Sequence, residues 1–370
     1  MIRQDCAPGQ GDGAHSSGPV LSVPTNVGGA SFRVRGLAVE TSARPARAPT
    51  LLVVSDSPEP FHVVVTALEP VADGVLGLVL EHPSGAALPG WEPGAHVDLH
   101  LPDGLVRQYS LCGDVADTAR WRVGVLREPA SRGGSAWLHE QLRVGEKLLV
   151  SAPRNNFPLV DAAGYVFVAG GIGVTPLLPM IAAVHAAGRP WTLAYGGRSR
   201  ASMAFVDVLA HHGDRVRLTA HDTDGLIDLD TLLGTPREGV AVYCCGPEPL
   251  LDAVESRCAA WPAGALHVER FAPKTGALDG ARASFEVELA GSGVTVTVGA
   301  DESIADAVEA AGIDVVSSCR EGTCGTCETT VLDGTPDHRD SYLTEDEQAA
   351  GDVMMICCSR SCGPRLVLDL

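Results

Sequence analysis

Short apolar runs separated by turn residues dominate the chain from residue 61 to about residue 155. The runs FHVVVTAL, GVLGLVLEH, AHVDLHL, VRQYSL and RWRVGVL have the length and spacing of β-strands. One helical pattern, AWLHEQL, interrupts them after SRGG, with Ser135 at the predicted N-cap. The pattern predicts a small antiparallel β-barrel in this region.

The period changes between residues 164 and 271. Continuous apolar runs (YVFVA, WTLAY, RVRLT, VAVYC and ALHVE) alternate with helical patterns (TPLLPMIAAVHAA, MAFVDVLAHH, DLDTLL and EPLLDAVESRCAA). Strands that alternate with helices indicate a doubly wound parallel α/β domain.

The two ends of the chain differ from this middle part. Residues 1–57 are rich in Gly, Pro, Ser and Ala and have no sustained periodicity, which predicts a disordered extension. The link APKTGALDGA leads into a third domain that runs from about residue 283 to the end. We therefore expect a barrel over 58–160, a parallel α/β domain over 161–274 and a C-terminal domain over 283–370.

Composition and charge narrow the classes of function. No apolar run in the 370 residues approaches the roughly 20 that a membrane helix needs, and the N-terminus has no apolar signal region. We expect a cytoplasmic protein without a membrane partner, whose 11 cysteines are ligands or free thiols. The net charge of −19 argues against a nucleic-acid partner. Residues 281–370 carry much of this charge, either to dock on a basic partner or to keep a face solvated.

The strongest chemical motif is CREGTCGTC, residues 319–327. Cys319, Cys324 and Cys327 are followed by a distant Cys357, and this C-x4-C-x2-C…C spacing is the plant-type arrangement for a 2Fe–2S cluster. Gly322 and Gly325 allow a tight loop whose N–H groups turn toward sulfur. Zinc is the alternative, but structural zinc sites usually present two C-x2-C pairs and this region has one. Cys358 and Cys362 also follow, as a packed thiol and a surface thiol.

At this point the sequence resembles a known family. Its last domain is similar to plant-type ferredoxins, which have a β-grasp fold, and residues 60–370 resemble phthalate dioxygenase reductase and its relatives. The resemblance implies the order of flavin domain, nicotinamide domain and ferredoxin domain. Residues 1–57 lie outside it.

The motif RQYSL supplies the predicted flavin residues. Arg107 can pair with the flavin phosphate, Tyr109 can pack on the isoalloxazine ring and Ser110 can hydrogen-bond near N5. The RGGS turn places Gly133, Gly134 and Ser135 at a helix N-terminus, where free N–H groups bind phosphate. The resemblance implies FMN, with FAD as the second choice.

The motif AGGIGVTP follows a strand and supplies the predicted nicotinamide-nucleotide site. Gly170, Gly171 and Gly173 allow the backbone to approach a pyrophosphate, Thr175 can cap the next helix and Pro176 suits its first turn. Pro176 stands where a Rossmann fingerprint has its third glycine, so the motif is that of the ferredoxin-reductase type.

Further residues of this site lie near strand ends. Cys245, Gly246 and Pro247 end a strand at the carboxyl edge of the sheet, where ligands bind in such folds. The resemblance implies that Cys245 lies near the nicotinamide ring and that Phe271 stacks on the flavin, although Phe271 could instead pack in the core; Cys244 is expected to be a core thiol. Arg198 and Arg200 could hold a 2′-phosphate and favour NADPH, whereas the family favours NADH.

The electron count then defines the function. NADH donates two electrons as hydride and a 2Fe–2S cluster carries one, so a flavin must stand between them. We expect an NAD(P)H-dependent reductase with Ser110, Cys245 and Phe271 as catalytic residues. It would be a monomer serving a separate Rieske-type oxygenase, demethylase or haem-thiolate monooxygenase. An iron–sulfur redox sensor and a reductase that releases free reduced flavin are the alternatives.

Overall fold

The computed structural model describes residues 59–129, 131 and 133–370, and these belong to one structural unit, Ser57–Leu370. The predicted extension 1–57 lies outside the described residues.

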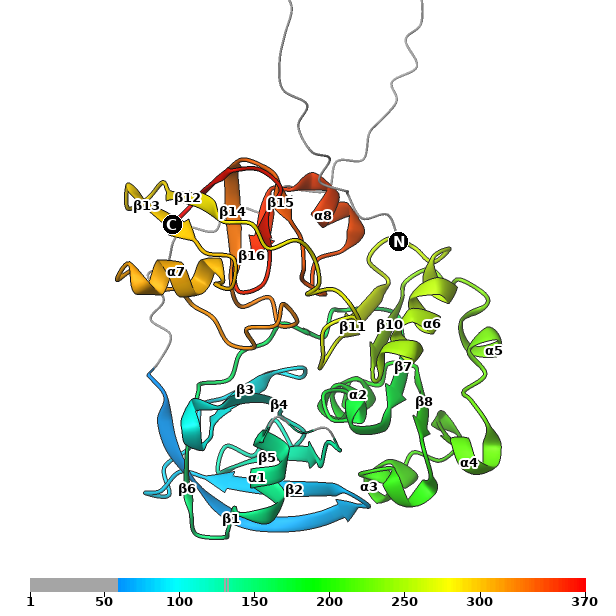
Figure 1. Cartoon of the computed structure of the whole chain (residues 1–370). Helices are drawn as coiled ribbons and strands as arrows, with labels where there is room; N and C mark the ends of the chain where they lie inside the picture. Colours follow the sequence, from blue (N-terminus) through cyan, green and yellow to red (C-terminus); the bar gives the residue numbers. More distant parts are fainter. Residues whose placement is uncertain (1–58, 130, 132) are drawn as a thin grey trace, which may run out of the picture. The chain divides into compact units, whose positions relative to one another are not determined.

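The first sheet is antiparallel, with strand order β4-β3-β6-β1-β2-β5 (Figure 1). A bridge from Leu111, just after β4, to Val123 on β5 joins the two edge strands, as the predicted barrel requires. Alternate inward residues such as Val63, Leu78 and Val97 form its core. Its elements are β1 (Phe61–Ala72), β2 (Val75–Glu81), β3 (His96–His100), η1 (Pro102–Gly104), β4 (Val106–Ser110), β5 (Arg120–Leu126), α1 (Gly134–Glu140) and β6 (Lys147–Val150).

The second sheet is parallel, with strand order β11-β10-β7-β8-β9. Every residue of β7 is buried, because Tyr165 and Phe167 pack with α2 on one face while Val166 and Val168 pack with α6 on the other. The elements are β7 (Gly164–Gly170), η2 (Gly171–Val174), α2 (Leu177–Ala186), β8 (Trp191–Gly197), η3 (Arg200–Ser202), α3 (Val206–Ala210), η4 (Gly213–Arg215), β9 (Val216–Ala220), α4 (His221–Asp224), α5 (Leu229–Leu233), β10 (Val240–Cys245), α6 (Glu248–Cys258) and β11 (Leu266–Glu269).

The third sheet is mixed, with strand order β13-β12-β18-β14-β16, and a two-stranded ribbon, β15-β17, accompanies it (Figure 1). Ile304 and Val308 of α7 pack into its core beside Cys327 and Cys357. Its elements are β12 (Phe285–Leu289), β13 (Val294–Val298), α7 (Ile304–Ala310), β14 (Glu328–Asp333), β15 (Pro336–Asp337), α8 (Glu345–Ala350), β16 (Val353–Met355), β17 (Arg360–Ser361) and β18 (Arg365–Leu368).

The predicted fold class is confirmed: an antiparallel sheet, a parallel α/β sheet and a ferredoxin-type domain follow each other along the chain. Sequence periodicity missed β6 and α4, which are short and lack a full repeat of either pattern. The domain boundaries at 58–160, 161–274 and 283–370 stay predictions. Among the described residues, no helix is long and apolar enough to cross a bilayer.

Candidate functional site: a cysteine loop beside two cofactor-type turns

The cysteine loop brings together the thiols that the spacing predicts. Cys324, Cys327 and Cys357 are buried, and the sulfur of Cys319 interacts with those of Cys324 and Cys357. Contacts with the thiols of Cys324 and Cys357 hold the pKa of Cys319 below its ordinary value, and the same contacts raise the pKa values of Cys324 and Cys357. A thiolate is the form that binds iron.

The loop backbone has the geometry of a sulfur cradle. Gly322 and Gly325 have φ of 70° and 73°, and the N–H groups of Glu321 and Thr323 each lie 3.4 Å from the Cys319 sulfur. Backbone donors around thiolates stabilise the charge of an iron–sulfur cluster. The loop therefore fits a binuclear cluster.

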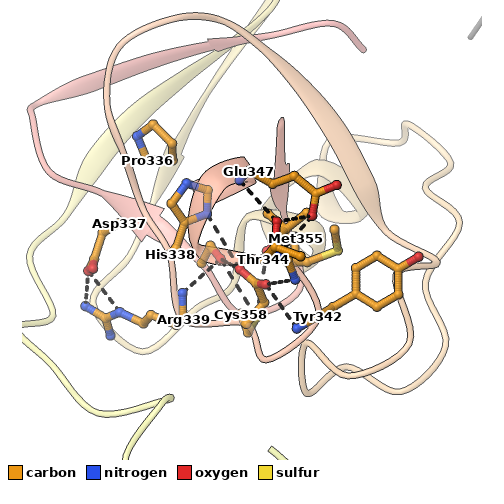
Figure 2. A network of polar contacts seen from close by, with 12 residues as sticks. Pro336, Asp337, His338, Arg339, Tyr342, Thr344, Glu347, Met355 and Cys358 are labelled. Atoms are coloured by element: carbon orange, nitrogen blue, oxygen red, sulfur yellow. Dashed lines mark hydrogen bonds and ion pairs between the residues drawn. The ribbon is translucent and has the colours of Figure 1, made fainter. Parts of the chain in front are cut away.

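A second segment, residues 338–344, contacts this loop, and Figure 2 shows the polar network around His338, Tyr342 and Thr344 in that segment. The Ser341 N–H donates to the Gly322 carbonyl at 2.9 Å, and a methyl group on Gly325 would overlap the Tyr342 ring. Buried Asp340 accepts from the N–H groups of Tyr342 and Leu343. The cysteine loop is therefore shaped by residues that follow it in the chain.

The charge of Asp340 is stabilised inside the domain. Burial opposes its ionisation, but contacts with His338 and with the Leu343 N–H outweigh burial and hold the pKa of Asp340 below its ordinary value. The Nδ1 atom of His338 lies 3.6 Å from the Asp340 carboxylate (Figure 2). Sequence analysis did not identify Asp340, since a single acidic residue in a loop carries no spacing signal.

Cys357 and Cys358 differ in their surroundings. Cys357 is buried, with its thiol in contact with Cys319 and Cys327 and also with the neighbouring Cys358. The Cys358 thiol points to the Met355 carbonyl at 3.8 Å and fills the space beside Gly322. Cys362 lies farther along, half-buried, with its sulfur 3.8 Å from the Pro336 carbonyl. This geometry favours Cys357 as the fourth ligand and Cys358 as a packing residue.

The predicted flavin residues meet at the first sheet. Arg107 and Tyr109 of β4 are half-buried on one strand face, and Ser110 is buried at the strand end. The side chain of Arg107 crosses Gly134, where a Cβ would lie 2.7 Å from Arg107 Cγ. Gly134 is thus required for Arg107 to reach the start of α1, where backbone N–H groups are unpaired within the helix. A guanidinium at a helix N-terminus suits a phosphate group.

The cap of α1 differs from the sequence expectation. Ser135 is not the N-cap, because the helix begins at Gly134 and Gly133, with φ of 97°, takes that position. Ser131 accepts hydrogen bonds from the N–H groups of Gly133 and Ala136, and Ser135 Oγ lies 3.0 Å from Ser131 Oγ. The positive φ of Gly133 lets the helix begin two residues earlier than the sequence pattern suggested.

The glycines after β7 have two different physical roles. A Cβ on Gly170 would lie 2.5 Å from Pro247 Cδ, and a Cβ on Gly173 would lie 2.3 Å from the Cys245 carbonyl. Gly171, with φ of 55°, has nothing within 4 Å of its Cβ position. Gly170 and Gly173 thus let the turn pack against residues 245–247, and Gly171 faces open space. Their contact with a pyrophosphate stays a prediction.

The helix that follows does not begin as expected. Thr175 does not cap α2, because its hydroxyl donates to the Ile172 carbonyl at 2.9 Å and its side chain is buried. A 3₁₀ turn over η2 precedes the helix, and Pro176 takes the N-cap position. The helix therefore starts one residue later than expected, which is within the common uncertainty for helix ends.

Cys245 ends β10 beside a carboxyl group that sequence analysis missed. Cys245 is fully buried, and its thiol donates to Glu269 of β11 at 3.9 Å. Burial raises the pKa of Glu269 to about 8, and burial together with Glu269 raises the pKa of Cys245. Cys244 is a core thiol as expected. Phe271 is 47% exposed after β11, so it does not pack in the core.

The raised pKa of Glu269 predicts a pH-dependent stability. Between pH 4.5 and about 8 the unfolded chain is ionised at this position while the folded chain keeps its proton, so stability falls as pH rises through this window. The contribution is up to about 1.4 kcal/mol per pH unit. Glu269→Gln is expected to remove this slope, measured by urea unfolding from pH 5 to pH 8. An unchanged slope would show that Glu269 is already ionised in the folded state.

Arg198 and Arg200 follow β8 and are both exposed. Arg200 begins η3 and lines a cavity of about 490 Å³ that Arg122 and Phe205 also line. The two arginines therefore lie on accessible surface after a strand of the parallel sheet. Their contact with a 2′-phosphate is untested.

Comparison with known proteins agrees with this geometry. Residues 287–362 match the model of the 2Fe-2S iron-sulfur cluster binding domain. The chain is 46% identical over 314 residues to phenoxybenzoate dioxygenase subunit beta of Ectopseudomonas oleovorans, covering 84% of this chain and 98% of that protein. The solved structure of phthalate dioxygenase reductase is 36% identical with a TM-score of 0.64, covering 84% of this chain and 98% of the other.

A larger solved protein contains the same architecture. An intact type IV self-sufficient cytochrome P450 monooxygenase is 47% identical with a TM-score of 0.76, over 84% of this chain. The present chain spans 41% of that protein's length. The shared part is thus found both as an individual chain and within a longer one.

Proposed function

Since this chain belongs to the phthalate dioxygenase reductase family of oxygenase reductases, we propose that it takes hydride from NADH onto bound FMN and passes single electrons through a 2Fe–2S cluster to a separate oxygenase. Its class is an electron-transferring oxidoreductase of an oxygenase system, with flavin-type, nicotinamide-type and 2Fe–2S domains. The finer choices of FMN, NADH and a separate partner are our proposals.

One observation carries the FMN proposal: Arg107 lies across Gly134 at the start of α1. Its guanidinium and the backbone N–H groups at the helix start that do not donate to Ser131 together suit one terminal phosphate. Tyr109 on the same strand face would hold the ring, and Ser110 would hydrogen-bond near N5. Bound flavin supplies the conversion of a two-electron hydride into single electrons.

The carboxyl edge of the parallel sheet would hold the nicotinamide. Cys245 and Glu269 are both neutral at pH 7 because burial raises their pKa values, so they place no anion beside a ring that donates hydride. Exposed Phe271 would cover the flavin face until nicotinamide replaces it. Gly171, Gly246 and Pro247 border the same turn, and Arg198 and Arg200 would contact the ribose end of the nucleotide.

The four cysteines would hold the two irons of the cluster. Cys319, Cys324, Cys327 and Cys357 would provide thiolate ligands, and the N–H groups of Glu321 and Thr323 would stabilise the sulfur charge. One NADH supplies two electrons, so the cluster must be reduced and reoxidised twice for each NADH oxidised.

The proposal is tested on the purified full chain. Flavin released by heat should be FMN by chromatography, and NADH should reduce cytochrome c with a larger kcat/KM than NADPH. Recovery of FAD alone would overturn the FMN choice, and a preference for NADPH would assign a 2′-phosphate contact to Arg198 and Arg200. Failure of both nucleotides to reduce the flavin would overturn the proposed function.

The relatives, the charge of the C-terminal domain and the cysteine chemistry bear on the partner and the cellular location. The individual-chain relatives favour a separate oxygenase component, and the acidic C-terminal domain would dock on a basic surface of it. A cytoplasmic location fits the use of NADH and the reduced thiols of the cysteine loop. The monomeric state stays a prediction, to be measured by light scattering.

A further inference from the structure

A cluster of polar side chains joins the first sheet to the cysteine loop, and Ser318 is at its centre. The Ser318 hydroxyl donates to the Asp98 carboxylate at 2.9 Å and accepts from Gln108 Nε2 at 2.6 Å and from Arg154 Nη2 at 2.9 Å. Arg154 also pairs with Asp98 at 2.7 Å. We name these four residues the Ser318 junction. A second contact lies beside it, where the Asn156 side chain donates to the Cys324 carbonyl.

The junction connects positions next to both redox sites. Ser318 directly precedes Cys319, the first predicted iron ligand. Gln108 lies between Arg107 and Tyr109 on β4 and pairs across the sheet with Asp98 on β3. Because side chains alternate along a strand, Arg107 and Tyr109 face one side and Gln108 faces the other. One strand thus contacts both the flavin site and the cysteine loop.

The hydrogen bonds of Ser318 form only when the cysteine loop lies against the first sheet. The Asp98 side chain is 7% exposed, and three of the four junction side chains belong to the first sheet and its flanking loop. Asp98 and Arg154 remain paired when the cysteine loop moves away with Ser318. Separation of the two domains therefore leaves no buried charge without a partner. Ser318 adds three hydrogen bonds, two of them to charged groups, whose net contributions are modest. Such a contact supports reversible docking rather than permanent fusion of the parts.

The ferredoxin domain is held near the other two domains by a covalent link as well as by the Ser318 junction. Residues 272–282 join the parallel domain to the ferredoxin domain, and Thr275 of this link is bonded to Glu248 of α6 while the N–H of Lys274 donates to Ser341. A tether sets the local concentration of the ferredoxin domain but not its orientation. Orientation over the flavin side must come from contacts such as the Ser318 junction.

We propose, on the basis of the function stated above, that Asp98 and Arg154 are positioning residues that dock the cysteine loop on the flavin barrel through Ser318. This docking fixes the distance over which electrons pass from flavin to cluster. Electron transfer weakens steeply with distance, so loss of the junction slows this step while hydride transfer from NADH, at the parallel sheet, continues. No chemical bond forms or breaks; one electron leaves the reduced flavin and one enters the cluster in each passage.

The test uses the holoprotein and three variants. Ser318→Ala and Asp98→Asn remove the two ends of the junction, and Ser317→Ala is the matched control one residue away. Stopped flow with NADH separates flavin reduction from the later reduction of the cluster. Flavin reduction is expected to keep its rate in all variants, whereas cluster reduction falls roughly tenfold or more in Ser318→Ala and Asp98→Asn. Ser318→Thr, which keeps the hydroxyl, should restore most of the rate.

A second readout does not depend on turnover. Amide hydrogen exchange should rise in residues 106–110 and 318–324 of Ser318→Ala, while the iron content and the electron paramagnetic resonance spectrum of the chemically reduced cluster stay unchanged. An unchanged rate of cluster reduction in both variants would overturn the positioning role, even if exchange increased. If Ser318→Ala loses iron, the rate of cluster reduction in Asp98→Asn tests the positioning role instead, because Asp98 lies outside the cysteine loop. Failure of NADH to reduce the flavin of the unmodified protein would instead overturn the proposed function.

Discussion

Replacing Cys357 by serine is expected to remove most of the visible absorbance of the iron–sulfur cluster while NADH still reduces the flavin. Cys357 is buried beside Cys319 and Cys327, and its loss would remove one of the four thiolates proposed to hold the cluster. Iron–sulfur clusters select thiolate ligands, and a serine hydroxyl is a poor substitute. Flavin reduction should persist because the predicted flavin and nicotinamide residues lie on the other two sheets.

The measurements are iron content, absorbance and cytochrome c reduction by NADH. Iron and cytochrome c reduction should fall to near background in Cys357→Ser. Cys358→Ser is the matched control, because that thiol points to the Met355 carbonyl, and it should keep both. Loss of iron in Cys358→Ser with retention in Cys357→Ser would mean that Cys358, and not Cys357, is the fourth iron ligand. Full electron transfer in Cys357→Ser would exclude the cluster from the path.

Arg107→Ala is expected to weaken flavin binding by roughly 10- to 100-fold, so the purified variant should lose its yellow colour on dilution. A charge-assisted hydrogen bond to phosphate contributes about 1.5–3 kcal/mol, and the remaining N–H groups of α1 cannot replace it. Flavin affinity is measured by fluorescence on titration of FMN into the deflavinated protein. The iron content should not change, since Arg107 lies on the flavin face of β4.

Arg143→Ala is the matched control for this variant. Arg143 follows α1 and donates to the carbonyls of Glu140 and Leu142, far from the start of the helix. Its removal should leave FMN affinity unchanged. Riboflavin, which lacks the phosphate, should bind Arg107→Ala and the unmodified protein equally. A larger loss for riboflavin than for FMN would place Arg107 against the ring instead of the phosphate.

Apolar periodicity was enough to predict the first two sheets, whereas the fold of the third domain was implied by the resemblance that the cysteine motif carries. Strands such as β7 are buried on both faces, and this gives continuous apolar runs that only a covered parallel sheet explains. Periodicity could not place β6 or the start of α1. β6 has four residues, and α1 begins where Gly133 adopts a positive φ, which depends on local geometry that the sequence does not display.

Motif spacing predicted the cysteine ligands but not their supports. The four cysteines follow a fixed covalent spacing, so the sequence contains the full ligand pattern. Ser318 and Glu269 act through contacts with residues far away in the chain, and Asp340 is a single acidic residue in a loop, so no local pattern marks any of the three. For Gly170 and Gly173 the sequence predicted contact with a pyrophosphate, which stays a prediction, whereas their close contact with residues 245–247 is visible only in the fold.

The contact of residues 338–344 with the cysteine loop has a consequence for how the cluster is assembled during folding. Gly322 and Gly325 take their conformation against Ser341 and Tyr342, and the fourth thiol stands just after β16. A nascent chain that has emerged only as far as residue 327 therefore presents three thiols on a loop with no fixed shape. Metal sites that do not pre-exist in the unfolded chain couple ligand binding to folding. Iron and sulfide are thus expected to bind late in biogenesis, after the C-terminal strands have assembled. The bound cluster would then stabilise the folded C-terminal domain.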